Sequence, residues 1–261
     1  MCFKKAVAKP SGFSRIFAFG LMIFSGAGLI NLCTVCAETT DELQGPPVAQ
    51  SHIIGIDPGH QGPNVDMSDL EPLGPGSTEM KAKASTGTQG TFSGLPEYQL
   101  NLDVALKLRD ELEARGYEVY MIRETNDVDI SNAERAQLAA ESGSDILIRI
   151  HANGSDNTSV AGALTMAPST ANPYLSQEMI AECQKLSQCI ITAFCASTGA
   201  NNQGVYQTDE MSGLNWCSIP ATIVEMGYMT NQEEDTRMQT ADYQQQMVTG
   251  IADGIDQYFA S

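Results

Sequence analysis

The sequence predicts an α/β fold built on a largely parallel sheet. Strand-like apolar segments alternate along the chain with segments of helical periodicity, which is typical of α/β proteins. The three most apolar segments (IIGI, ILIRI and ATIVEM) are continuous rather than alternating, as in strands buried on both faces of a parallel sheet. Ligand sites in such folds collect beyond the carboxyl ends of the strands, so the residues there are the first candidates for a site.

The first 37 residues predict an export segment. A basic start precedes an apolar run from residue 16 to about residue 35, and Val35-Cys36-Ala37 offers small residues for cleavage before Glu38. The run of about 20 residues is also long enough to cross a bilayer. The segment is therefore either a cleaved signal peptide or an uncleaved N-terminal anchor. Its basic residues are Lys4, Lys5, Lys9 and Arg15.

Residues 38–50 (ETTDELQGPPVAQ) are polar with proline and glycine, and predict a flexible leader. Residues 51–261 are then expected to form one domain, because about 220 residues can bury one sizeable core. The whole chain has 32 acidic against 14 basic residues, and four of the basic residues lie in the export segment. Nucleic acid and anionic membranes repel such a chain, so no nucleic-acid partner is expected, and membrane contact only through an N-terminal anchor. Nothing in the sequence indicates an oligomeric state.

Four cysteines follow the export segment. Cys183, Cys189 and Cys195 lie on one predicted helix at spacings of six, which separates neighbours by about 9 Å along the axis, too far for a disulfide. A bond between Cys195 and Cys217 remains as an alternative to four free thiols, and free thiols are favoured. Cys33 and Cys36 form a CxxC pair, but its place in the export segment argues against a metal or redox role.

The first half of the domain alternates strands and helices around one long loop. Residues 61–94 are rich in Gly, Pro, Ser and Thr without periodicity, and a long loop that leaves a histidine is usually functional. Leucines on one face predict the helix that begins at Pro96-Glu97, and Gly116 ends it. Ser131 and Glu134 form a capping box at the start of the next helix. The expected elements are strand 52–57, loop 61–94, helix 96–115, strand 117–122, helix 131–142 and strand 145–150.

The second half continues the alternation. Asn172-Pro173 is expected to start a long helix, and the final helix carries an apolar face that includes Met247 and Ile251. The expected elements are strand 163–166, helix 172–199, a weak strand 204–208, strand 220–226 and helix 241–258.

Two of the three histidines of the chain follow strands. His60 lies after a Pro-Gly turn at the end of IIGIDP, and His151 ends the run DILIRI. A catalytic zinc takes three protein ligands, often imidazole and carboxylate, and leaves its fourth position to water. Glu97 is the third candidate ligand, because it lies in the first turn of its helix, where the helix dipole stabilises a carboxylate. Glu225 is the candidate general base, because an acid inside the apolar strand ATIVEM is costly unless it is used or paired.

Structural interpretations compete with each of these functional ones. A histidine after a strand is often a loop residue whose hydrogen bonds are satisfied, and Glu225 is equally explained as one half of a buried ion pair. His52 precedes its strand at the opposite edge of the sheet, and is expected to be exposed and structural. Asn153, in the sequence HAN, either holds the loop after His151 or contacts substrate.

Four segments, in this order, closely resemble the zinc-dependent N-acetylmuramoyl-L-alanine amidases of the amidase type 3 family: IGIDPGHQG, LPEYQLNLDVALKLRDELEARGYEVYMIRETND, SDILIRIHANGS and IPATIVEMGYMTNQEED. The resemblance covers about residues 52–259. It implies a three-layer fold, an open sheet of about six strands with helices on both faces. It also implies zinc ligands at His60, Glu97 and His151, a catalytic glutamate at Glu225, and hydrolysis of the amide between N-acetylmuramic acid and L-alanine in peptidoglycan. Such a protein is expected to be secreted and associated with the cell wall.

Two positions depart from the common family pattern. Gln61 stands where a second glycine usually follows the first histidine, and is expected to alter the rim of the site. Arg149 occupies a strand position where a small residue is frequent, and is not expected to touch a ligand. Two rival functions remain open at this stage, another zinc peptidase acting within the stem peptide and a non-catalytic wall-binding module.

Overall fold

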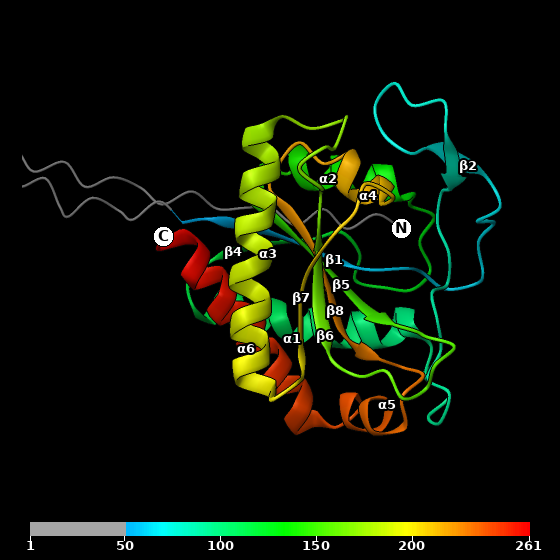
Figure 1. Ribbon diagram of the computed structural model, residues 1–261, viewed down its shortest axis with the longest axis vertical. Coiled ribbons are helices and arrows are strands. Elements are labelled where there is room, and N and C mark those ends of the chain that lie inside the picture. The colour runs from blue at the N-terminus through cyan, green and yellow to red at the C-terminus, as the bar shows by residue number, and fades with distance from the viewer. Residues whose placement is uncertain (1–50) are drawn as a thin grey trace, which may run out of the picture. The chain divides into compact units, whose positions relative to one another are not determined.

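The computed structural model describes residues 51–261, in which six strands form one sheet with helices on both faces (Figure 1). The spatial order is β4-β1-β5-β8-β6-β7, and only the pair of β6 and β8 is antiparallel. The predicted three-layer, mostly parallel open sheet is thus confirmed. The strands are β1 (Ile53–Pro58), β4 (Glu118–Met121), β5 (Ile146–Asn153), β6 (Ala163–Ala167), β7 (Asn202–Gln207) and β8 (Ala221–Tyr228).

Three long helices cover one face of the sheet, and two shorter ones cover the other. Helices α1 (Glu97–Ala114), α3 (Gln177–Thr198) and α6 (Ala241–Phe259) enclose the larger core with the isoleucines of β1 and β5. Helices α2 (Asn132–Glu141) and α4 (Ser212–Asn215) enclose a smaller core on the opposite face, with Leu147 and Ile223.

Strand β5 divides its side chains between the two faces, because successive residues of a strand alternate. Ile146, Ile148 and Ile150 are fully buried in the larger core, whereas Leu147 packs in the smaller one. Arg149 and His151 follow Leu147 at spacings of two, so they lie on the α2 and α4 face. On the face of β5 that points toward α2 and α4, the side chains are therefore polar from residue 149 onward, although the strand as a whole is apolar.

Several element boundaries differ from those predicted. The segment 61–94 contains a hairpin, β2 (Leu70–Pro72) paired with β3 (Met80–Ala82), whose strands are too short to show a period. Helix α3 begins at Gln177 rather than near Asn172, because the Ser176 side chain accepts a hydrogen bond from the Met179 backbone and caps it. Neither α4 nor α5 (Gln232–Met238) was predicted.

Other local predictions are confirmed. Ser131 and Glu134 form the expected capping box at the start of α2. Cys183, Cys189, Cys195 and Cys217 are all free thiols, so the alternative bond between Cys195 and Cys217 is wrong. Burial raises the pKa of Cys217 to about 12, which keeps this thiol protonated and unreactive.

The predicted export segment (1–37) and leader (38–50) lie outside the described residues, and so do Cys33 and Cys36. Within residues 51–261, none of the helices is both long and apolar enough to cross a bilayer.

Candidate active site

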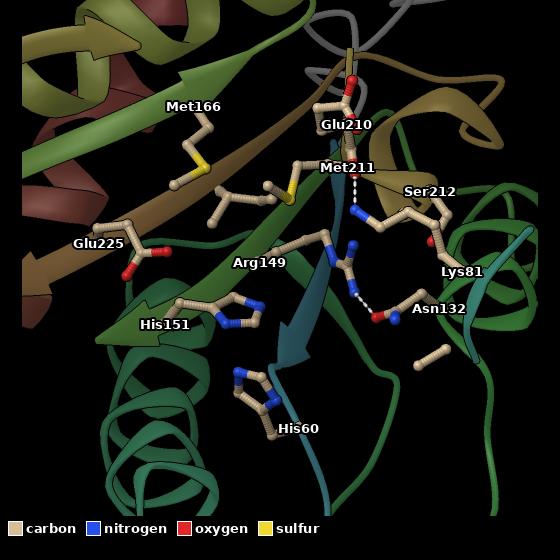
Figure 2. A pocket seen from close by; sticks show the side chains of 13 residues that line it. His60, Lys81, Asn132, Arg149, His151, Met166, Glu210, Met211, Ser212 and Glu225 are labelled. Atoms are coloured by element: carbon tan, nitrogen blue, oxygen red, sulfur yellow. Dashed lines mark hydrogen bonds between the residues drawn. The ribbon is translucent and has the colours of Figure 1, made fainter. Parts of the chain in front are cut away.

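Three of the candidate site residues meet where β1, β5 and α1 come together. The potential ligand atoms of His60, Glu97 and His151 all lie within 4.8 Å of one another. Nε2 of His60 and Nδ1 of His151 approach the same oxygen, Oε1 of Glu97, at 3.1 and 3.2 Å. The two imidazole rings stand nearly perpendicular, with centroids 4.7 Å apart (Figure 2). Two ring nitrogens and one carboxylate oxygen thus surround a common point.

This donor set fits a divalent metal ion. Nδ1 of His60 lies 3.1 Å from the backbone oxygen of Ser85, and when it donates a hydrogen bond there, Nε2 carries a lone pair. That lone pair faces an oxygen of Glu97, so two electron-rich atoms oppose each other. A cation between them satisfies both atoms, and two imidazoles with one carboxylate are a zinc ligand set that leaves a position for water. The contact with Ser85 orients the ring, as partners of metal-bound histidines commonly do.

Backbone donors hold the Glu97 carboxylate in place. Its Oε2 accepts a hydrogen bond from the Thr88 backbone at 2.8 Å, and its Oε1 accepts one from the Ala152 backbone at 3.1 Å. Burial alone would raise the pKa of Glu97, but the close contacts with the His151 and His60 rings outweigh burial and bring the pKa well below its usual range. This carboxylate is therefore ionised and fixed in position.

Glu225 lies beside His151 on the neighbouring strand. The two residues are Cα partners in the register of β5 and β8, and both line the same cavity. The Glu225 side chain is buried, and its Oε2 has no hydrogen-bond partner among residues 51–261. Burial, and then the charge of Glu97, raise the pKa of Glu225 to about 8. An unpartnered carboxyl of raised pKa beside a candidate metal-ligand set is suited to general acid–base chemistry. The alternative of a buried ion pair has no support, since Glu225 forms no ion pair with a basic side chain among residues 51–261.

Two buried arginines hold the turn that carries His60. This residue has a φ of 63°, in the left-handed region that a side chain other than glycine adopts at a cost of about 1–3 kcal/mol. Arg135 donates to the backbone oxygens of Pro58 and His60, and to Oδ1 of Asp57 at 2.6 Å. Arg123 donates to the backbone oxygens of Pro58 and Gly59. These contacts fix the turn and thereby position the first imidazole.

A cavity of about 210 Å³ opens beside the two histidines (Figure 2). Strand β3 of the hairpin and the segment before α4 form its far side. Its lining residues are His60, Lys81, Ala82, Asn132, Arg149, His151, Met166, Glu210, Met211, Ser212, Gly213, Ile223 and Glu225.

Comparison with known proteins decides the family. The profile of Amidase_3, described as N-acetylmuramoyl-L-alanine amidase, matches residues 54–257. The chain belongs to this amidase family. The match covers the sheet from Ile54 onward and all four candidate site residues.

Curated relatives and solved structures agree with this family. The chain is 26% identical over 229 residues to N-acetylmuramoyl-L-alanine amidase LytC of Bacillus subtilis (strain 168). The aligned region covers 88% of this chain but only 39% of LytC. It is 24% identical to N-acetylmuramoyl-L-alanine amidase Rv3717 of Mycobacterium tuberculosis, covering 80% of this chain and 87% of Rv3717. The crystal structure of the amidase Ami1 from Mycobacterium smegmatis superposes with a TM-score of 0.72 at 25% identity, covering 80% of this chain and 97% of Ami1.

Three further residues of this Amidase_3 chain had predicted places, and the structure contradicts the prediction for Gln61. Gln61 is fully buried and does not shape the rim; its Oε1 accepts a hydrogen bond from Arg135 at 2.6 Å. His52 is half-buried, stacks on Phe259 and contacts Asp145, which confirms its structural role but not full exposure. Asn153 accepts a hydrogen bond from the backbone of Gly154, the first residue after β5.

The sequence did not point to a role for the two arginines at this candidate site, Arg149 and Arg135. Arg149 does not contact a candidate ligand, as expected, but its side chain lines the same cavity. The signal was a charge inside the apolar run ILIRI, since a charge buried in a strand requires a partner. The partner of Arg149 is Asp57, whose Oδ2 lies 2.8 Å from Nε of the arginine. Arg135 gave a weaker signal, because surface helices often carry arginines and only tertiary packing buries this one.

The raised pKa of Glu225 predicts a pH-dependent stability of the metal-free protein. The folded state keeps a proton up to about pH 8, whereas the unfolded chain releases it near the ordinary value of 4.5. The free energy of unfolding therefore falls as pH rises through this window, by up to about 1.4 kcal/mol per pH unit. Glutamine does not titrate, so the free energy of unfolding of Glu225→Gln does not fall in this way. Relative to wild type, it should therefore rise by about 3 kcal/mol between about pH 5 and pH 7.5. Denaturant unfolding of both chelator-treated proteins measures this gain, and parallel pH profiles would refute it.

Proposed function

We propose that this chain is a zinc-dependent peptidoglycan amidase, which cleaves the bond between N-acetylmuramic acid and the L-alanine of the stem peptide. The observation that carries the proposal is the convergence of His60, Glu97 and His151, with an unpartnered Glu225 on the adjacent strand. Family membership supplies the substrate class, because the matching profile is described by this activity. Export through the first 37 residues, either cleaved or kept as an anchor, would bring the enzyme to the cell wall.

Each of the four residues has a distinct role in this proposal. His60, Glu97 and His151 hold the zinc ion. When bound, the ion polarises the amide carbonyl and makes water a better nucleophile at neutral pH. Glu225 takes a proton from the attacking water and later delivers it to the nitrogen of L-alanine as the amide bond breaks. Its raised pKa suits both steps, because a base that must also act as an acid works best near the operating pH.

Mass spectrometry of wall digests tests the cleaved bond. Purified walls incubated with the protein and zinc should release stem peptides with a free L-alanine amine, and leave glycan with a free lactyl carboxylate. Chelator should stop the release, and added zinc should restore it. Products that keep L-alanine on the lactyl group, but lack residues further along the stem, would instead identify the rival peptidase. A protein that binds walls without releasing any product would be the non-catalytic module.

A further inference from the structure

The cavity beside the ligands has a cationic side that the proposed chemistry does not use. Arg149 lies two residues before His151 on β5, on the same face, and only 2% of its surface is exposed. Its Nε contacts Asp57 and its Nη2 donates to Oδ1 of Asn132 at 2.9 Å. Within residues 51–261, its Nη1 has no hydrogen-bond partner. Figure 2 shows the guanidinium between the histidines and the far side of the cavity, where Lys81 and Asn132 lie.

The backbone of α4 is shaped around this guanidinium. A Cβ atom on Gly213 would lie 1.4 Å from Nη1 of Arg149, so the arginine can occupy its place only because residue 213 is glycine. Asn132 lines the cavity as well and uses only its oxygen on Arg149. The guanidinium is therefore held rigidly against α4, and Arg149 and Asn132 both line the cavity.

The charges around Arg149 leave room for an anion. Asp57 is the carboxylate paired with Arg149, and it is shared with Arg135 at 2.6 Å, so one buried acid serves two buried guanidinium groups. Lys81 adds a further cation at the cavity, where its Nζ donates to the backbone oxygen of Glu210. Glu210 itself is exposed at the rim, where water screens its charge. Buried guanidinium groups bind carboxylates strongly and with defined geometry.

The substrate offers such an anion on one side of the scissile bond only. The sugars beside the bond are neutral, and the lactyl carboxyl is consumed in the amide. On the peptide side, the second residue is D-glutamate joined onward through its γ-carboxyl, so its α-carboxyl is either free or amidated. Two extended residues reach about 7 Å, and Arg149 lies about 7 Å along β5 from His151. The length of two stem residues thus matches the distance along β5 from His151 to Arg149.

We propose that Arg149, with Asn132 and Lys81, forms a subsite for the free α-carboxylate of the second stem residue, and that the enzyme prefers walls in which this group is not amidated. The inference rests on the proposed amidase function. It assigns the cavity to the peptide side of the substrate and gives Arg149 a role in specificity.

Two wall preparations test the subsite, identical except that the second residue carries a free α-carboxylate in one and an amide in the other. Wild type with zinc should release stems from the carboxylate wall at least about tenfold faster, since a charge-assisted hydrogen bond is worth this factor or more. Arg149→Met should bring the ratio of initial rates close to one, and Lys81→Met should lower it. Arg109→Met, a surface variant on α1, should keep the wild-type ratio.

Equal wild-type rates on the two walls would overturn the subsite while leaving the amidase function intact. A wild-type ratio retained in Arg149→Met would overturn it as well. If Arg149→Met does not fold, Lys81→Met tests the subsite instead, because Lys81 lies on the surface hairpin. The ratio of its initial rates on the two walls must then be lower than that of wild type. If zinc-loaded wild type released stems from neither wall, the proposed function itself would be wrong.

Discussion

Replacing Glu225 with glutamine is expected to lower kcat for stem release by about 10²–10⁴-fold, which is the usual contribution of a general acid–base group. Glutamine matches glutamate in size but cannot take the proton of the attacking water. Glu225 does not belong to the three converging ligand residues, so bound zinc should stay at the wild-type level. Initial rates on purified walls and metal analysis of the same sample measure both quantities.

The matched control is Glu233→Gln, an exposed glutamate at the start of α5 that should leave kcat unchanged. A Glu225→Gln enzyme with wild-type kcat would show that another group moves the proton. A variant that lost its zinc along with its activity would instead place Glu225 among the metal ligands.

Replacing Arg135 with methionine should lower the free energy of unfolding by about 3–5 kcal/mol, as expected when one partner of a buried ion pair is removed. Arg135 is 1% exposed and donates to Asp57, Gln61 and three backbone oxygens. Methionine fills the space but donates no hydrogen bond, so each of these acceptors loses one donor. The left-handed turn at His60 also loses its support, so zinc affinity should fall together with stability.

Denaturant unfolding of the chelator-treated proteins measures the stability change, and zinc titration measures the affinity. Arg109→Met is the control, because the ion pairs of Arg109 with Asp110 and Glu124 lie at the surface and their loss should change stability by less than about 1 kcal/mol. Equal stability losses in the two variants would mean that the buried arginine does not hold the turn.

The sequence predicted the sheet well because its strands are buried on both faces. Continuous apolar runs such as IIGI and ATIVEM have no other common explanation when helical segments separate them. The topology then placed His60 and His151 at one rim, and their convergence on Glu97 follows from the parallel arrangement of β1 and β5. Glu225 was predicted as a site residue because an acid inside an apolar strand is costly unless it is paired or used.

The parts that the sequence did not predict depend on contacts between distant segments. The hairpin β2–β3 has strands of three residues each, and packing rather than periodicity defines them. The position of Gln61 next to His60 predicts a place at the rim, but the left-handed turn directs its side chain into the protein toward Arg135. Arg149 gave the same signal as Glu225, a charge in a buried strand, and only the structure shows which cavity it faces.

Zinc titration of the chelator-treated protein tests the central claim most directly, that three residues hold one catalytic metal ion. Bound zinc and stem release from walls are followed in the same samples, for wild type and for His60→Ala. Both signals should saturate together at one zinc per wild-type chain, and His60→Ala should bind zinc at least about tenfold more weakly with little activity. Full activity without bound zinc, or saturation unchanged in His60→Ala, would contradict the account.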